Sequence, residues 1–103
     1  MSAVLIDPSY AELTYLTGQP VEALLDSGSL SLWLEHVATP VTFAGQSSFS
    51  VRLTGPADRP LTPGAHLLRT SQGDFMLVLE AVARDMRHLH YEAFLTEAAP
   101  IAA

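Results

Sequence analysis

Hydrophobic and polar positions alternate along much of this chain between residues 49 and 95, and short turn-forming clusters interrupt the alternation. Phe49, Val51 and Leu53 are separated by single polar residues, which is typical of a strand with one buried face. Three intervening clusters share the Gly, Pro or Asp residues that favour turns: residues 55–60, 61–64 and 71–74. This pattern predicts antiparallel β-structure.

The full set of predicted strands has six members: residues 21–25, 30–37, 49–54, 65–70, 75–83 and 88–95. The first two strands form a hairpin around the Asp-Ser-Gly-Ser segment at 26–29. Residues 75–79 are apolar on both faces, so we expect their strand to lie centrally. The fold class predicted is all-β: about six antiparallel strands in a small sandwich or partly open barrel.

One short N-terminal helix is expected before the strands. Ser9 is the predicted N-cap, and Glu12 completes a capping box. Tyr10, Leu13 and Leu16 follow at helical spacing, so the helix is predicted from about residue 9 to residue 17.

The longest loop is predicted at residues 39–48, where Val41 and Phe43 are the only large apolar residues. A chain of 103 residues buries roughly two-thirds of its unfolded surface, which suffices for one core. We therefore expect a single β domain over residues 1–96. Residues 97–103 are small and predict a frayed C-terminal tail.

Composition excludes several function classes. The net charge is −6, and the five basic residues, all Arg, are too few and too scattered to follow a nucleic-acid backbone. Without cysteine there is no thiolate nucleophile and no Cys-ligated metal centre. No signal peptide and no long apolar run is visible, so we expect no membrane contact and a cytoplasmic location, with delivery as part of an assembly left open.

The histidines offer one candidate for metal or small-ligand binding. His88 and His90 lie two residues apart in a predicted strand and share a face, as metal ligands often do. Glu92 extends that face, and His66 could join from a neighbouring strand. Two co-facial ligands fall short of a closed zinc site, so a solvated polar face is the expected alternative. We predict no metal and no cofactor.

Catalytic residues are not predicted. Glu35 and His36 are adjacent, so in a strand they point to opposite faces, and His36 continues the core row of Leu30, Leu32 and Leu34. The chain has no nucleophile elbow, phosphate loop, dinucleotide fingerprint or calcium loop. We expect that the protein is not an enzyme.

Apolar side chains off the expected core mark a candidate interface. Charged residues make up 16% of the chain, below the ~25% of typical domains, so more surface is available for contact. The candidate interface residues are Trp33, Val21, Ala23, Leu25, Met76 and Val78. The competing interpretation is that the N-terminal helix and the 39–48 loop cover these side chains within one monomer.

Four segments in order resemble an uncharacterised bacterial domain family with the patterns F-S-L-x-F-x-G-P and Y-E-A-x-F-N. The segments are residues 49–56, 61–64, 73–79 and 91–95. Pro63, His66 and Ala81 depart from the residues that the family favours. Members of this family accompany phage-tail-collar-like proteins. The resemblance implies a structural or accessory protein and supplies no catalytic residue.

Two functions follow as expectations. The first is a non-enzymatic structural or protein-interaction module that associates with itself or with a protein partner, in a phage-tail-like or filamentous assembly. The alternative is a small β-barrel that binds a metal or small ligand through His66, His88, His90 and Glu92.

Overall fold

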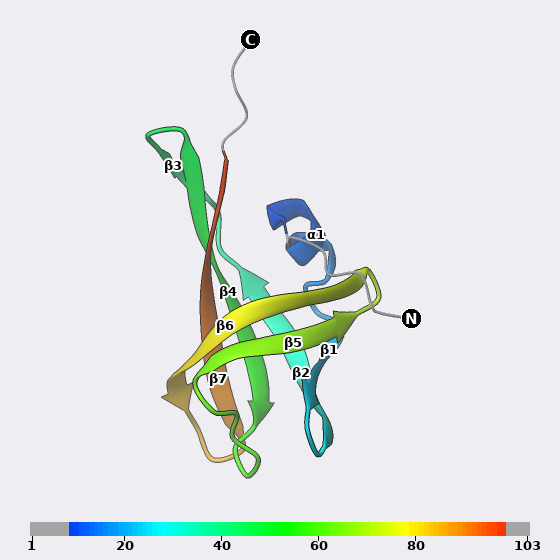
Figure 1. Cartoon of the computed structure of the whole chain (residues 1–103). Coiled ribbons are helices and arrows are strands. Elements are labelled where there is room, and N and C mark those ends of the chain that lie inside the picture. Colours follow the sequence, from blue (N-terminus) through cyan, green and yellow to red (C-terminus); the bar gives the residue numbers. More distant parts are fainter. Residues whose placement is uncertain (1–8, 99–103) are drawn as a thin grey trace.

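The computed structural model describes residues 9–98, which form one helix and seven strands (Figure 1). In chain order these are α1 (Tyr10–Tyr15), β1 (Pro20–Leu25), β2 (Gly28–Val37), β3 (Val41–Phe43), β4 (Gln46–Pro56), β5 (Gly64–Thr70), β6 (Gly73–Arg84) and β7 (His88–Ala98). All six predicted strands are present. The prediction of a mainly β fold with one short N-terminal helix is confirmed.

Six of the strands close into an antiparallel barrel. Their order is β2-β1-β5-β6-β7-β4, and the pairing of β2 with β4 joins the two ends of the sheet. Strand β3 pairs only with β4 and lies outside the barrel. Of the two architectures expected, the structure has the barrel, and the barrel is closed.

The core fills the barrel with the inward side chains of every strand. The two rows that the alternation predicts to be buried are buried: Leu30, Leu32 and Leu34 of β2, and Phe49, Val51 and Leu53 of β4. Leu77 and Leu79 of β6 are buried with them. Helix α1 lies at one end of the barrel (Figure 1) and buries Leu13 and Leu16 against this core. Ser9 Oγ accepts a hydrogen bond from the Glu12 backbone N–H at 3.2 Å, which confirms the predicted N-cap.

The predicted loop at residues 39–48 is wrong for most of its length, because residues 41–43 and 46–48 form strands. Strand β3 forms a hairpin with the start of β4, and the two-residue turn at Ala44 and Gly45 has φ values of 51° and 79°. Both values are positive, as the tight hairpin turn with matching twist requires. Ala-Gly is a weaker turn signal than Asn-Gly, and for this reason the pattern did not reveal the hairpin.

The prediction that His36 continues the core row of β2 is also wrong. The register between β2 and β4 shifts between Leu34 and His36, which marks a bulge at Glu35. Because the bulge adds one residue, Glu35 and His36 are both exposed, and the next buried residue is Val37. The inward row of β2 therefore jumps from Leu34 to Val37.

The C-terminal strand is longer than expected. Strand β7 continues through Ala98, whose register partner is Gln46, so it passes the predicted domain boundary at residue 96. Residues 1–8 of the predicted domain and 99–103 of the predicted tail lie outside the described residues. The six-residue helix is much too short to cross a membrane, and residues 9–98 contain no other helix.

Candidate functional site

A groove opens on the barrel wall where β2 and β4 separate. The two strands pair from Val37 and Val51 as far as Trp33 and Thr54, and Gly28–Leu32 then diverge from the end of β4. The resulting hollow has a volume of about 590 Å³. This volume lies within the ~300–1,000 Å³ that is usual for ligand sites.

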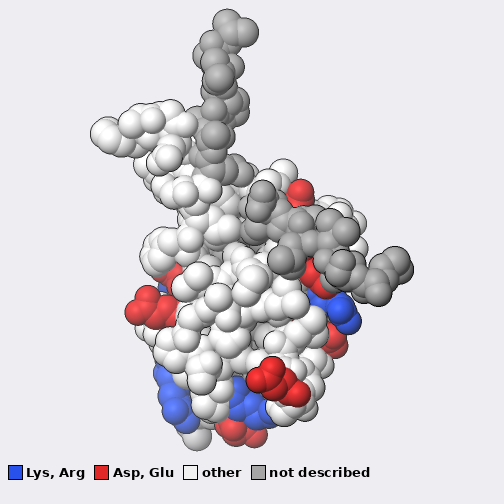
Figure 2. Space-filling view, in the orientation of Figure 1, with Lys and Arg blue, Asp and Glu red and all other residues white. Residues whose placement is uncertain are grey.

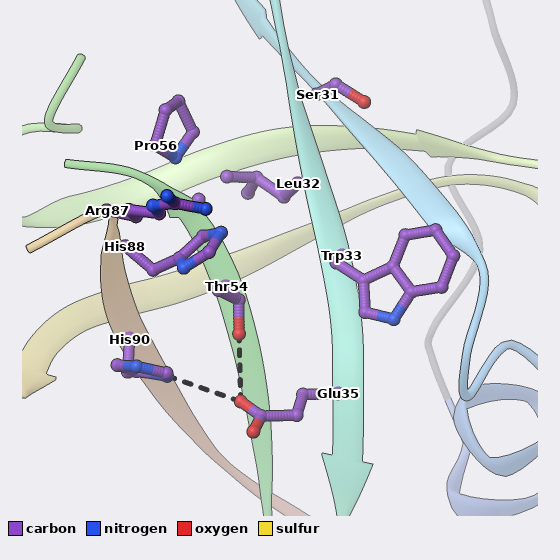
Figure 3. Close-up of a pocket in the computed structure, with 10 residues that line it drawn as sticks. Ser31, Leu32, Trp33, Glu35, Thr54, Pro56, Arg87, His88 and His90 are labelled. Carbon is purple, nitrogen blue, oxygen red and sulfur yellow. Dashed lines mark hydrogen bonds and ion pairs between the residues drawn. The ribbon is translucent and has the colours of Figure 1, made fainter. Parts of the chain in front are cut away.

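Figure 3 shows how side chains from three strands surround this groove. Trp33 stands on one wall. Arg87, from the turn before β7, and His88, the first residue of β7, stand on the other wall. Leu32 and Thr54 lie between the walls. The groove therefore combines an aromatic ring, an apolar floor and cationic or titratable groups.

Glu35 closes one end of the groove through two polar contacts. Its Oε2 accepts a hydrogen bond from Thr54 Oγ1 at 2.8 Å and lies 3.4 Å from His90 Nδ1 (Figure 3). The Thr54 hydroxyl, and then His90, hold the pKa of Glu35 below its usual 4.5. Glu35 lies two residues after Trp33 and shares its outer face, and the bulge at Glu35 brings His36 to the exposed side as well.

Asp85 organises the turn that carries Arg87 and His88. Its Oδ1 accepts hydrogen bonds from the backbone N–H groups of both residues at 2.8 Å, and its Oδ2 lies 3.2 Å from His90 Nε2. The N–H groups of Arg87 and His88, followed by His90, lower the pKa of Asp85 from 3.8 to about 2. His90 thus lies between two carboxylates, one at each ring nitrogen.

The residues of the metal hypothesis do not converge. His88 and His90 line the groove on the outer face, as predicted, but Glu92 pairs with Arg52 at 3.1 Å. His66 is in register with the buried Leu77 and contacts the Thr62 carbonyl oxygen at 2.6 Å, so it lies on the inner side of the wall. No group of three or more potential ligands within residues 9–98 could hold a metal ion.

The candidate interface residues divide between the two faces of the barrel wall. Val21 and Ala23 are buried in the core, and Leu25 packs against it, so their assignment to an interface is wrong. The physical reason is that β1 is paired on both sides, and these three residues form its inward row. Trp33, by contrast, is 49% exposed in the groove.

The other two candidates, Met76 and Val78, belong to a patch on the outer wall that we call the outer apolar band. Leu24, Leu67 and Met76 are register partners across β1, β5 and β6, and Ala65 is the partner of Val78. Figure 2 shows a largely uncharged area over β5 and β6, with charged residues mainly along its border. Met76 is 49% exposed and Val78 66%.

Sequence reasoning missed the groove residues Glu35, Thr54 and Arg87, and also Asp85, which holds the turn beside the groove. Asp85 carried a local signal, because Asp followed by a polar turn commonly accepts backbone N–H groups two and three residues ahead. Glu35 and His90 are 55 residues apart and meet only because β4 lies between β2 and β7. No local sequence pattern could have predicted this contact between Glu35 and His90.

Comparisons with known proteins identify a family for this chain. The comparison with curated proteins finds no match, and neither does the comparison with solved structures. A family described as a domain of unknown function, DUF6916, matches residues 8–95, which run from before α1 into β7. The expectation of an uncharacterised domain family is confirmed in this form. The chain belongs to the DUF6916 family.

Proposed function

We propose that this protein is a non-enzymatic protein-interaction module that associates with a second copy through the outer apolar band. The observation that carries the proposal is the in-register row of Leu24, Leu67 and Met76, extended by Ala65 and Val78. Large contiguous apolar patches are rare on the surface of monomeric proteins, and where they occur they usually mark interaction sites.

Charges beside the band favour a second copy as the occupant. Glu22 and Arg69 are register partners on β1 and β5, in the row next to Leu24 and Leu67. A twofold interface is self-complementary, so two copies can each bring Glu22 towards the other's Arg69. Opposite charges at the rim orient the two copies relative to each other. Burial of the apolar row stabilises the dimer by roughly 25 cal/mol per Å² of apolar surface removed from water.

The biological setting that we propose is a phage-tail-like or filamentous assembly, with this chain as an accessory component. The resemblance of residues 49–56 and 91–95 to a family that accompanies phage-tail-collar-like proteins supports this setting.

Light scattering across a concentration series tests the proposal. The wild-type mass is expected to rise from monomer to dimer between low and high micromolar concentration. The double variant Met76→Ser/Val78→Ser should stay monomeric, because it removes the exposed centre of the band. Val82→Ser/Met86→Ser is the matched control, since it changes the same two residue types at exposed positions outside the band.

Two results would reject this function. One is a wild-type protein that remains a monomer throughout the series. The other is a Met76→Ser/Val78→Ser variant that dimerises as the wild type does, with an unchanged melting temperature.

A further inference from the structure

Strand β2 has an open edge beside the groove. The Leu34 N–H donates to the Gln19 carbonyl and the Leu34 carbonyl accepts from the Gly18 N–H, so the backbone of Leu34 faces the β1 side. Backbone groups alternate in direction along a strand, so those of Ser29 and Ser31 face away from β1. In the part of the chain that the structure describes, no strand pairs with Gly28–Leu32 on that side.

The opposite wall of the groove carries a cation without an ionic partner. The carboxylates of Glu35 and Asp85 are both engaged, by Thr54 and His90 and by the turn N–H groups. Arg87 forms no ion pair with any residue between 9 and 98. Arg87 is therefore the cation of the groove that is left without an ionic partner, whereas both carboxylates beside it already accept hydrogen bonds.

We propose that this groove binds an extended peptide that adds as a strand to the open edge of β2 and places a carboxylate on Arg87. The N–H and C=O groups of Ser29 and Ser31 provide a ladder for the peptide backbone. The Arg87 guanidinium provides a charge-assisted hydrogen bond to the carboxylate. Trp33, which is 49% exposed in the groove, provides apolar contact for one peptide side chain.

An extended peptide fits these features better than a small carboxylate does. A small anion would use Arg87 and leave the β2 edge open, whereas a strand engages both walls of the groove. Gly28–Leu32 spans five residues, which is close to the usual strand length of ~5–6 residues. The carboxylate can belong to an Asp or Glu side chain or to the C-terminus of the peptide.

The test uses heptapeptides displayed on phage in two libraries, one with a free C-terminus and one without. Enriched sequences are synthesised with a fluorescent label and titrated with the full chain by fluorescence anisotropy. Amidation of the C-terminus, or replacement of Asp and Glu by Asn and Gln, identifies which carboxylate is used. Loss of affinity after C-terminal amidation, or after replacement of Asp and Glu, supports the proposal.

Variants of the protein and of the peptide separate the two halves of the site. Arg87→Gln should weaken binding about tenfold or more, because a hydrogen bond to a charged group is lost. Arg84→Gln is the matched control, since Arg84 is an exposed arginine of β6 that does not line the groove. N-methylation of the peptide backbone at alternate residues should abolish binding without any change to the protein.

Three results would overturn the proposal. They are the absence of any enriched peptide, binding that Arg87→Gln leaves unchanged, and binding that survives N-methylation at every position. The groove is lined by β2, β4 and the start of β7, whereas the outer apolar band lies on β1, β5 and β6. Failure here would therefore leave the light-scattering result on self-association intact, and the converse also holds.

Discussion

Leu32 packs directly over the backbone of Gly55 at the point where β2 and β4 separate. A Cβ atom on residue 55 would lie 2.6 Å from Leu32 Cδ2 and 3.4 Å from Tyr91 Cε2. Side-chain contact at 2.6 Å is not tolerated, so glycine lets Leu32 fill the barrel interior here. The packing of Leu32 at the floor of the groove thus depends on the absence of a side chain at Gly55.

Gly55→Ala should destabilise the protein by about 1–3 kcal/mol, because Leu32 must leave its rotamer to make room. Urea unfolding measures the change. In the double variant with Leu32→Val, which lacks the clashing Cδ2 atom, the cost of Gly55→Ala should shrink. Equal costs in both backgrounds would show that the Leu32 contact is not the cause.

Tyr91→Phe should cost about 1–3 kcal/mol of unfolding free energy, because a buried donor loses its acceptor. The Tyr91 hydroxyl accepts a hydrogen bond from the buried Leu61 N–H at 3.0 Å and so ties the loop before β5 to the core. Tyr15→Phe is the control, since Tyr15 is 64% exposed and should change stability little. Equal thermal denaturation midpoints for the two variants would contradict this role of Tyr91.

Asp85 should make stability depend on pH in acid. Its folded pKa of about 2 lies below the ordinary 3.8, so the ionised carboxylate stabilises the folded state above pH 3.8. That contribution should be lost as the pH falls from about 4 to about 2. Glu35, whose pKa is also lowered, should add to the loss in the same direction.

The measurement is urea unfolding of wild type and Asp85→Asn at pH 5 and at pH 2. The variant should be less stable than wild type at pH 5, and the two should converge at pH 2. Asp58→Asn, at an exposed turn position, serves as the control. A difference between wild type and Asp85→Asn that persists unchanged at pH 2 would refute the assignment.

Zinc should not bind stoichiometrically. Both ring nitrogens of His90 already face carboxylates, Glu92 is held by Arg52, and His66 lies on the inner side of the wall. Isothermal titration with Zn²⁺, on protein without a His tag, should show no saturable site. One tightly held zinc per chain, lost in His88→Ala/His90→Ala, would restore the metal hypothesis.

Alternation of residue types along the chain was enough to predict the strands and much of the core. It works because an inward row must be apolar at every second position, as in Phe49, Val51 and Leu53. Three features escaped it: the bulge at Glu35, the closure between β2 and β4, and the β3 hairpin. A bulge changes the parity of the row, and closure depends on pairing between distant segments, so neither leaves a local pattern.

The candidate site was predicted only in part for the same reason. His88, His90 and Trp33 are on the outer face because simple alternation holds around them. Val21 and Ala23 were misassigned because an almost uniformly apolar strand does not reveal which of its faces is inward. Once β1 is paired on both sides, Leu24 is its outward apolar residue and belongs to the outer apolar band.

The most direct test of the outer apolar band is the oxidation rate of Met76 relative to Met86. Both methionines are accessible to hydrogen peroxide in the monomer, at 49% and 98% exposure, and mass spectrometry of tryptic peptides separates them. Burial of the band between two copies should slow Met76 oxidation at high protein concentration and leave Met86 unchanged. Equal relative rates in a dilute sample that light scattering shows to be monomeric and in a concentrated sample that it shows to be dimeric would contradict the account.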